Sequence, residues 1–133
     1  MQDVDVGQKV LVKEAEVIAA MLSGGYVMAC DGKALPPDTA VADANVLGRL
    51  SIATATHVGT DVVMSGLCGT TDRKGTLRWF RACDIEGATV MQGPVAVKGG
   101  KTEAPLMVSR IDVLPGDRID IDMATFQVLR QKL

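Results

Sequence analysis

The only histidine is the first place to look for catalysis. His57 is the one imidazole in the chain, so a Ser–His–Asp mechanism would have to be built on it. Its neighbours, Thr-His-Val-Gly, are typical of a solvated loop, and no G-x-S-x-G segment is present to hold a nucleophile on a sharp turn. Its nucleophile would have to be Ser51, Ser65 or Ser109. One histidine also excludes a histidine-rich metal site. We therefore expect no catalytic residue and no enzyme.

Carboxylates near the end of the chain are the next candidates. The main acidic cluster consists of Asp112, Asp117, Asp120 and Asp122. Asp120 and Asp122 are two residues apart, so on a strand both project from one face, and a hard cation such as calcium uses such oxygens. Arg118 on the same face favours a charged solvent surface that discourages edge-to-edge aggregation. Without an aromatic sugar platform a glycosidase pair is disfavoured, and we expect no metal.

Glycines and cysteines provide no cofactor motif. Residues 99–102 read Gly-Gly-Lys-Thr, like the end of a phosphate-binding loop, but the earlier glycine is missing and Glu103 follows. A hairpin turn is predicted there instead. Cys30, Cys68 and Cys83 form no C-x-x-C pair, which argues against zinc. The three thiols are expected to be free, as in a reducing compartment, and the alternative is one disulfide among them. No cofactor is expected.

Composition limits the classes of partner. The chain has 133 residues, 47% of them hydrophobic, which suits one domain with its own core. Lys and Arg number 14 against 16 Asp and Glu, so no strong field attracts nucleic acid or an anionic membrane. With 3% aromatic residues a base-stacking surface is disfavoured. The first residues are acidic where a signal peptide is basic, which predicts synthesis and retention in the cytosol of the producer.

The pattern along the chain predicts one helix followed by strands. Residues 1–9 are polar without a period and are expected to form a flexible arm. Apolar residues then recur near the helical period, and two glycines follow, predicting a helix over 10–23. The remaining runs are short, apolar or alternating, and separated by Gly, Pro and Asp. They fall at 26–30, 47–55, 61–68, 76–84, 88–97, 106–114 and 117–129.

Seven or eight short strands at near-regular spacing predict an antiparallel β-sandwich, jelly-roll or immunoglobulin-like. The whole of 10–133 is expected to be one such domain, including the helix. In its clearest strand, Trp79 and Phe80 lie on opposite faces, so both faces should be covered. In the last strand, Ile119, Ile121 and Met123 are expected to face one way.

What remains suits recognition of another protein. The open arm, a proline-containing loop over 32–45, and a strand rich in Trp, Phe and Arg stand out, and these three residue types are favoured in interfaces. The alternative is that the two rings pack on the two sides of one strand. The candidate interface residues are Val4, Val6, Lys9, Leu35, Pro36, Pro37, Arg78, Trp79, Phe80 and Arg81.

Several segments resemble one family in the same order. Residues 77–84 (LRWFRACD) and 87–95 (GATVMQGPV) follow the pattern aromatic-Phe-Arg, Asp, a Gly turn, Val, then Gly and Val. Residues 34–38 match a Pro loop, 46–50 an L-G-x-L strand, and 115–119 a turn followed by a Gly-Asp-x-Ile strand. This order resembles small virion structural proteins of tailed bacteriophages, although the stretch 56–75 is shorter than in that pattern.

The resemblance implies a mechanical role without catalytic or cofactor residues. It implies a capsid cement or decoration protein, located in the virion, that binds the major capsid protein across subunit junctions and forms a dimer or trimer on the particle. One alternative is a tail, neck or baseplate component. Another is a β-sandwich module that binds carbohydrate or protein.

Overall fold

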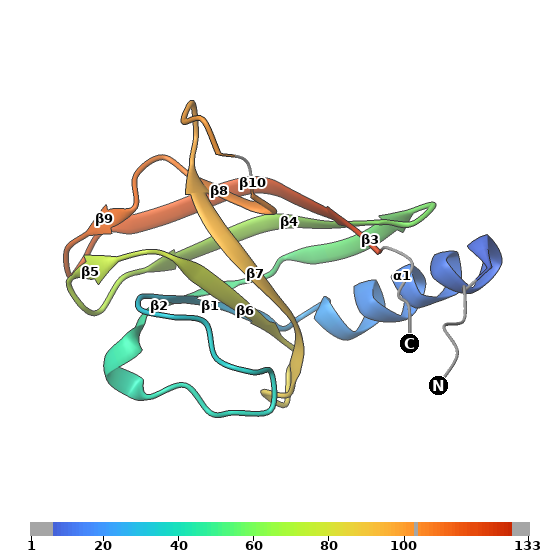
Figure 1. The fold of residues 1–133 in the computed structure, drawn as a ribbon, viewed down its shortest axis with the longest axis horizontal. Coiled ribbons are helices and arrows are strands. Elements are labelled where there is room, and N and C mark those ends of the chain that lie inside the picture. The colour runs from blue at the N-terminus through green and yellow to red at the C-terminus, as the bar shows by residue number, and fades with distance from the viewer. Residues whose placement is uncertain (1–6, 103, 129–133) are drawn as a thin grey trace.

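The structure is a computed structural model that describes residues 7–102 and 104–128. It contains one α-helix and ten strands in this described part, with a short 3-10 turn before the second strand (Figure 1). The elements are α1 (Gln8–Leu22), β1 (Tyr26–Cys30), η1 (Asp43–Asn45), β2 (Val46–Ser51), β3 (Thr54–Val58), β4 (Asp61–Thr70), β5 (Gly75–Thr76), β6 (Trp79–Cys83), β7 (Thr89–Val97), β8 (Leu106–Val108), β9 (Asp112–Val113) and β10 (Arg118–Gln127).

Eight of the strands form one curled sheet in the order β10-β4-β2-β1-β6-β7-β8, with β3 also pairing to β4. The pairs are antiparallel except β7–β8, which is parallel. The two end strands, β8 and β10, contact each other, so the sheet curls back on itself. The mainly β class with one helix is confirmed. The predicted sandwich is not confirmed, and the sheet is mixed rather than purely antiparallel.

Element boundaries differ from the predicted ones in four places. The helix begins at Gln8, so Lys9 belongs to it and the predicted arm over 1–9 is too long; Val4 and Val6 lie outside the described residues. The predicted strand 47–55 is divided into β2 and β3, 76–84 into β5 and β6, and 106–114 into β8 and β9. A hairpin was predicted at the turn after β7. This prediction is wrong, because β8 runs parallel to β7.

Glycines fix the two clearest turns. After α1, the backbone N–H of Ser23 bonds to the carbonyl of Ala19, and Gly24 has φ +79°, so the helix ends at the predicted glycine pair. Before β10, Asp117 N–H donates to the Leu114 carbonyl at 3.1 Å across a Pro-Gly pair in which Gly116 has φ +90°. This is the predicted type II turn.

Strands β4 and β10 reverse their buried faces at the same level of the sheet. In β4 the buried side chains change from Val62 and Met64 to Leu67, with Gly66 at φ +65° between them. The opposite residues of β10 change in the same way: Ile121 is buried, whereas Met123 is 64% exposed. The prediction that Met123 faces the same way as the isoleucines is therefore wrong, because the alternation breaks between them.

The reversal divides the molecule into two connected parts. One is a barrel-like body that consists of β1, β2, β6, β7 and β8 together with the halves of β4 and β10 that lie beyond the reversal, toward Thr70 and Arg118. The other, called here the extension, consists of α1, β3, residues 61–65 of β4 and residues 123–127 of β10. Figure 1 shows α1 at this end, beside β3 and the ends of β4 and β10. The helix buries Leu11, Ala15, Ala19 and Leu22, spaced at three or four residues.

Candidate interaction surface

The aromatic strand lies inside the body. Trp79 and Arg81 are each 3% exposed and Phe80 is fully buried, whereas Arg78 is exposed. Both faces of β6 are covered, as the two rings on opposite sides predicted. Three of the four candidate interface residues on this strand are therefore interior in the single chain. Trp79 donates from Nε1 to the Asp31 carbonyl at 3.1 Å, so its polar edge is already bonded within the protein.

Arg81 holds the proline loop onto the body. Its Nη1 donates to the Thr39 carbonyl at 2.7 Å, its Nη2 to the Pro36 carbonyl at 2.9 Å and its Nε to the Gln92 side-chain oxygen at 3.1 Å. Gln92 in turn donates to the Leu35 carbonyl. The three acceptors of the guanidinium are neutral, so the buried charge is stabilised by two peptide carbonyls and one side-chain amide instead of a carboxylate. The loop is consequently a fixed surface.

The two ends of the loop are also joined. Asp31 N–H donates to the Asn45 carbonyl at 3.0 Å, and the Asn45 amide donates to the Asp31 carboxylate at 2.8 Å. Such closed ends are typical of an Ω-loop. Pro36 and Pro37 are exposed on it and Leu35 is half-buried. An open hollow of about 310 Å³ lies beside it, lined by Gly32, Ala34, Arg78, Trp79, Gln92, Gly93 and Pro94.

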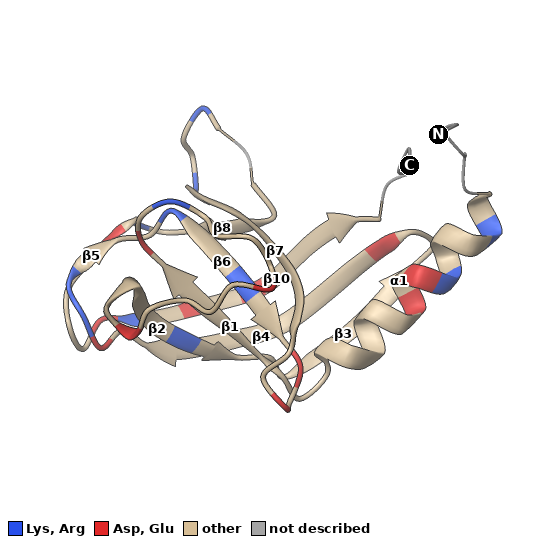
Figure 2. Ribbon diagram, turned by 60° about the horizontal axis from the view of Figure 1, so that its bottom comes forward, with Lys and Arg blue, Asp and Glu red and all other residues tan. Residues whose placement is uncertain are grey.

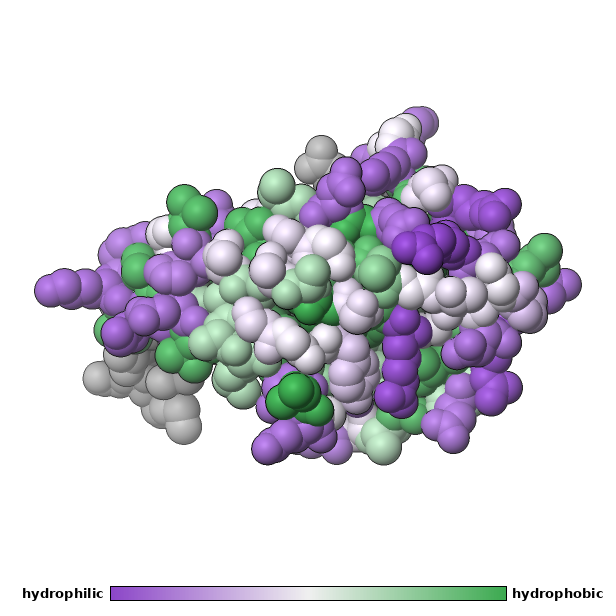
Figure 3. Space-filling view, turned by 180° about the vertical axis from the view of Figure 1, so that it is seen from behind, coloured by the Kyte–Doolittle hydropathy of each residue, from purple (hydrophilic) through white to green (hydrophobic). Residues whose placement is uncertain are grey.

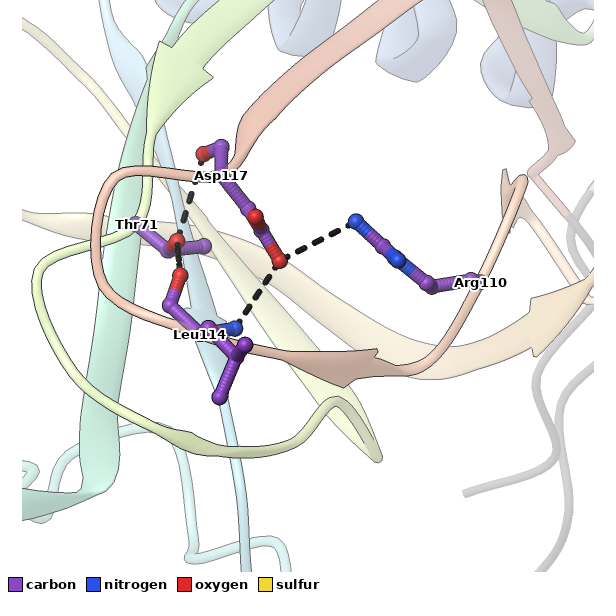
Figure 4. Close-up of polar contacts among 4 residues, drawn as sticks. All are labelled: Thr71, Arg110, Leu114 and Asp117. Carbon is purple, nitrogen blue, oxygen red and sulfur yellow. Dashed lines mark hydrogen bonds and ion pairs between the residues drawn. The ribbon is translucent and has the colours of Figure 1, made fainter.

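The Asp117 region is a second polar cluster, and its contacts are internal (Figure 4). The Asp117 carboxylate accepts from the Leu114 N–H at 2.9 Å and forms an ion pair with Arg110 at 3.2 Å. The buried Thr71 hydroxyl bonds to the Leu114 carbonyl, and the Thr71 N–H donates to the Asp117 carbonyl at 2.8 Å. These bonds fasten the turn before β10 to the end of β4. The carboxylate therefore has a structural role.

The other candidates from the sequence are dispersed. His57 lies on β3 rather than in a loop as predicted, and its Nδ1 is buried without a hydrogen-bond partner in the described structure. Asp120 pairs with Arg118 at 2.7 Å on the surface. Among the described residues no group of three or more His, Cys, Asp or Glu side chains is placed to hold a metal ion. The three cysteines are free. Burial raises the pKa of Cys30 to about 12.

Exposed apolar side chains are concentrated on the extension. Of the seven large apolar side chains that are exposed in the described residues, five belong to it; the other two are Ile85 and Leu114 on turns of the body. On β3, Val58 is 70% exposed. The five are Val10, Val17, Met21, Val58 and Met123. They lie on two sides of the extension, three of them on α1 and two on its strands. Contiguous exposed apolar residues indicate an interaction surface, whereas scattered ones are ordinary.

Three of the five form a stripe on α1. With about 100° per residue, Val10, Val17 and Met21 lie within about 40° of one another, and about 135° from the centre of the buried face. Between them and Ile18 lies an apolar hollow of about 300 Å³, flanked by Lys13 and Glu14. A helix that is apolar on two sides is characteristic of burial on both. Within residues 7–102 and 104–128, only one side of α1 is covered.

The sheet face of the extension opposite α1 carries mainly short side chains and a single charge. Rows of directly paired residues cross β3, β4 and β10, and each member is exposed or half-buried. The rows are Thr54–Ser65–Met123, Thr56–Val63–Thr125 and Val58–Asp61–Gln127. Asp61 is the single charge among the nine. We call this set the row face.

Charges lie elsewhere on the molecule. Figure 2 shows blue and red segments on α1 and on the loops of the body, whereas the strands of the extension are almost entirely without them. Figure 3 shows, from behind, a pale and near-neutral middle with strongly hydrophilic residues toward both ends. Low charge at the centre with charged residues around it is the composition of protein interfaces.

Sequence reasoning missed both surfaces of the extension. A signal for the α1 stripe was present, because Val10, Val17 and Met21 share one helical face, about 135° from the centre of the buried one. Counting every apolar residue toward a single core hid the second face. For the row face no such signal existed, since it depends on which strands pair.

Comparison with protein-family models, with curated proteins and with solved structures finds no match. No helix in the described part of the chain is long and apolar enough to span a membrane.

Proposed function

We propose that the chain is a non-enzymatic structural protein of a tailed-phage virion, specifically a capsid cement or decoration protein that binds across junctions of major capsid subunits. The observation that carries the assembly role is the extension, where five of the seven exposed large apolar side chains in the described residues are found. The phage context comes from the resemblance in residues 34–38, 46–50, 77–95 and 115–119.

The row face supports binding to protein over binding to sugar. It presents short Thr, Ser and Val side chains on a regular sheet, with Met123 at its margin. A sugar platform uses exposed aromatic rings, and the rings of Trp79 and Phe80 are buried. A surface with a single charge gains affinity mainly through buried area, and a specific contact needs roughly 1,200–2,000 Å² in total. Repetition around a symmetric shell multiplies each small contact.

The fixed proline loop supplies a second contact region. Arg81 and Gln92 bond to its backbone, which holds exposed Pro36 and Pro37 in place before any partner arrives. A surface ordered in advance loses less entropy on binding. Such a surface suits a protein that adds to a shell already assembled.

Quantitative mass spectrometry of particles purified from the bacterium that carries the gene tests the proposal. A cement protein is expected in hundreds of copies, in a fixed ratio to the major capsid protein. A copy number of roughly six to twelve would instead assign it to a neck, tail or baseplate ring. Absence from the particles would overturn the proposal.

A surface variant tests whether the extension is needed for incorporation into particles. Thr56→Lys places a charge in the middle of the row face, where Thr56 is exposed and opposite Val63. We expect the variant to fold and to be lost from particles. Its matched control is Ile85→Lys, an exposed change on the body. Incorporation of Thr56→Lys at the normal copy number would exclude the row face as the contact.

A further inference from the structure

The outer face of α1 is built for a second copy of the same helix. We infer that two chains associate through the stripe of Val10, Val17 and Met21, with the two helices parallel and related by a two-fold axis that runs along the stripe. The inference concerns the free chain and goes beyond the proposed function, because it holds whether or not the protein belongs to a phage particle.

The helix α1 is apolar on two sides that lie about 135° apart. Leu11, Ala15, Ala19 and Leu22 are buried against the sheet, while Val17 on the other side is 51% exposed. Exposing this stripe to water is unfavourable at roughly 25 cal/mol per Å². A partner that removes the stripe from water must itself be apolar. A second α1 offers an apolar stripe of the same length and shape.

The charges beside the stripe are complementary to those of a second copy. Lys13 and Glu14 lie about 50° to either side of the stripe centre, at nearly the same height along the helix. The described charged residues of α1 are two lysines and two glutamates, so the face has no net charge to repel its own copy. Lys13 forms an exposed ion pair with Glu16 at 3.3 Å in the single chain, and such a pair contributes little.

The positions of these charges select the orientation of the pair. A two-fold axis along the stripe exchanges left and right, so it places Lys13 of one copy against Glu14 of the other on both sides. An axis across the stripe keeps left and right, and when it passes near Lys13 and Glu14 it places like charges together. An isologous contact therefore satisfies both ion pairs only when the helices are parallel.

The orientation is compatible with the rest of the molecule. The stripe faces about 135° away from the buried side of α1, so a two-fold rotation places the second body on the far side of the helix pair. The row face lies on the opposite side of the extension from α1. It stays open in the dimer, and each dimer then presents two row faces to a larger assembly.

Sedimentation velocity of the full chain, from micromolar to millimolar concentration, tests the pair. We expect twice the 14.0 kDa mass of one chain. Val17→Glu should give the monomer, while the control Ile85→Glu, at an even more exposed apolar position off the helix, should remain a dimer. A monomeric wild type at every concentration, or a dimer unaffected by Val17→Glu, would overturn the inference.

Charge exchange tests the contact between Lys13 and Glu14. Lys13→Glu alone and Glu14→Lys alone should each weaken the dimer roughly tenfold, because each turns two exposed attractive pairs into repulsive ones. The double variant Lys13→Glu/Glu14→Lys should restore the wild-type affinity. Additive weakening in the double variant would refute this contact.

Disulfide trapping tests the orientation. Val10→Cys and Met21→Cys are made separately in a Cys68→Ser background, since the other two native thiols are buried. The two positions are about 16 Å apart along the helix. In a parallel pair each cysteine meets its own counterpart, so both variants should form crosslinked dimers. If only one of them crosslinks, or neither does, the parallel arrangement is wrong. Particle incorporation is measured separately, so either proposal can fail alone.

Discussion

Arg81 carries a buried positive charge that three neutral oxygens stabilise. Arg81→Met keeps the length of the side chain but leaves the carbonyls of Pro36 and Thr39 without their donor. We expect a loss of roughly 2–4 kcal/mol in the free energy of unfolding, since hydrogen bonds to a charged group contribute about 1.5–3 kcal/mol each and part is regained by the apolar replacement. Urea denaturation measures the loss, and faster tryptic cleavage after Lys33 reports the released loop. Arg78→Met, an exposed change three residues away, should stay within about 0.5 kcal/mol. Equal effects of the two variants would contradict the bonding described.

Burial of Cys30 makes the free energy of unfolding depend on pH in the alkaline range. Burial raises its pKa in the folded protein to about 12, from an ordinary value of 9.0. Because the folded pKa is the higher one, the unfolded chain loses its proton first. The stability from this thiol is therefore fully present below about pH 9 and is lost as the pH rises toward 12. Burial raises the pKa of Cys83 and of Tyr26 in the same direction.

The measurement is the free energy of unfolding from urea curves at intervals between pH 8 and pH 11. Cys30→Ala should flatten the decline above pH 9, and the slope is compared instead of the level because the smaller side chain lowers stability at every pH. Parallel curves for the two proteins would show that Cys30 does not titrate as described.

At the scale of elements, Gly66 allows β4 and β10 to reverse their buried faces. It has φ +65°, and a Cβ at this position would lie 2.8 Å from the Cβ of Ala53. Gly59 has φ +60° with open space around it. Gly59→Ala should therefore cost about 1–2 kcal/mol, the cost of the left-handed backbone alone. Gly66→Ala should cost more, by roughly 1 kcal/mol or above, because contact with Ala53 adds to it. Thermal unfolding compares the stabilities of the two variants. An equal loss of stability would mean that Ala53 moves away from the new Cβ at no energetic cost.

The predicted elements succeeded where local chemistry decides them and failed where pairing does. The helix end at Gly24 and the type II turn at Gly116 follow from residues next to each other in the chain. The reversal at Gly66 does not, because a lone glycine in an apolar run has the same local signature as a weakened strand. The parallel pairing of β8 is likewise absent from the local pattern. Its turn glycines at 99 and 100 suit a hairpin equally well.

The candidate site was least predictable for the same reason. Trp79 and Phe80 were predicted in the interface because aromatic residues are favoured there. Their strand is instead central in the sheet and covered on both faces. The row face is made of ordinary Thr, Ser and Val residues from three separate strands. Its character comes from their adjacency, which exists only in the folded sheet.

At the scale of the whole molecule, the body and the extension share two continuous strands. Both β4 and β10 pass through the reversal point without a break in their pairing register, from Arg118–Thr70 to Gln127–Asp61. Unfolding the extension would strip half of each strand of its partners and expose the apolar side chains under α1. We therefore expect the two parts to unfold together in one transition.

Two probes and one variant test this cooperativity. Trp79 is the only tryptophan and reports on the body, whereas the far-ultraviolet circular dichroism of α1 reports on the extension. Leu11→Ala removes a buried side chain at the outer end of α1, which should cost about 2–4 kcal/mol. If the parts are one cooperative unit, the fluorescence and dichroism midpoints move by the same amount although Trp79 lies in the other part. Lys9→Ala, an exposed change on the same helix, should move neither by more than about 0.5 kcal/mol. A shift of the dichroism midpoint with the Trp79 midpoint unchanged would show instead that the extension unfolds on its own, and that β4 and β10 are hinged at Gly66.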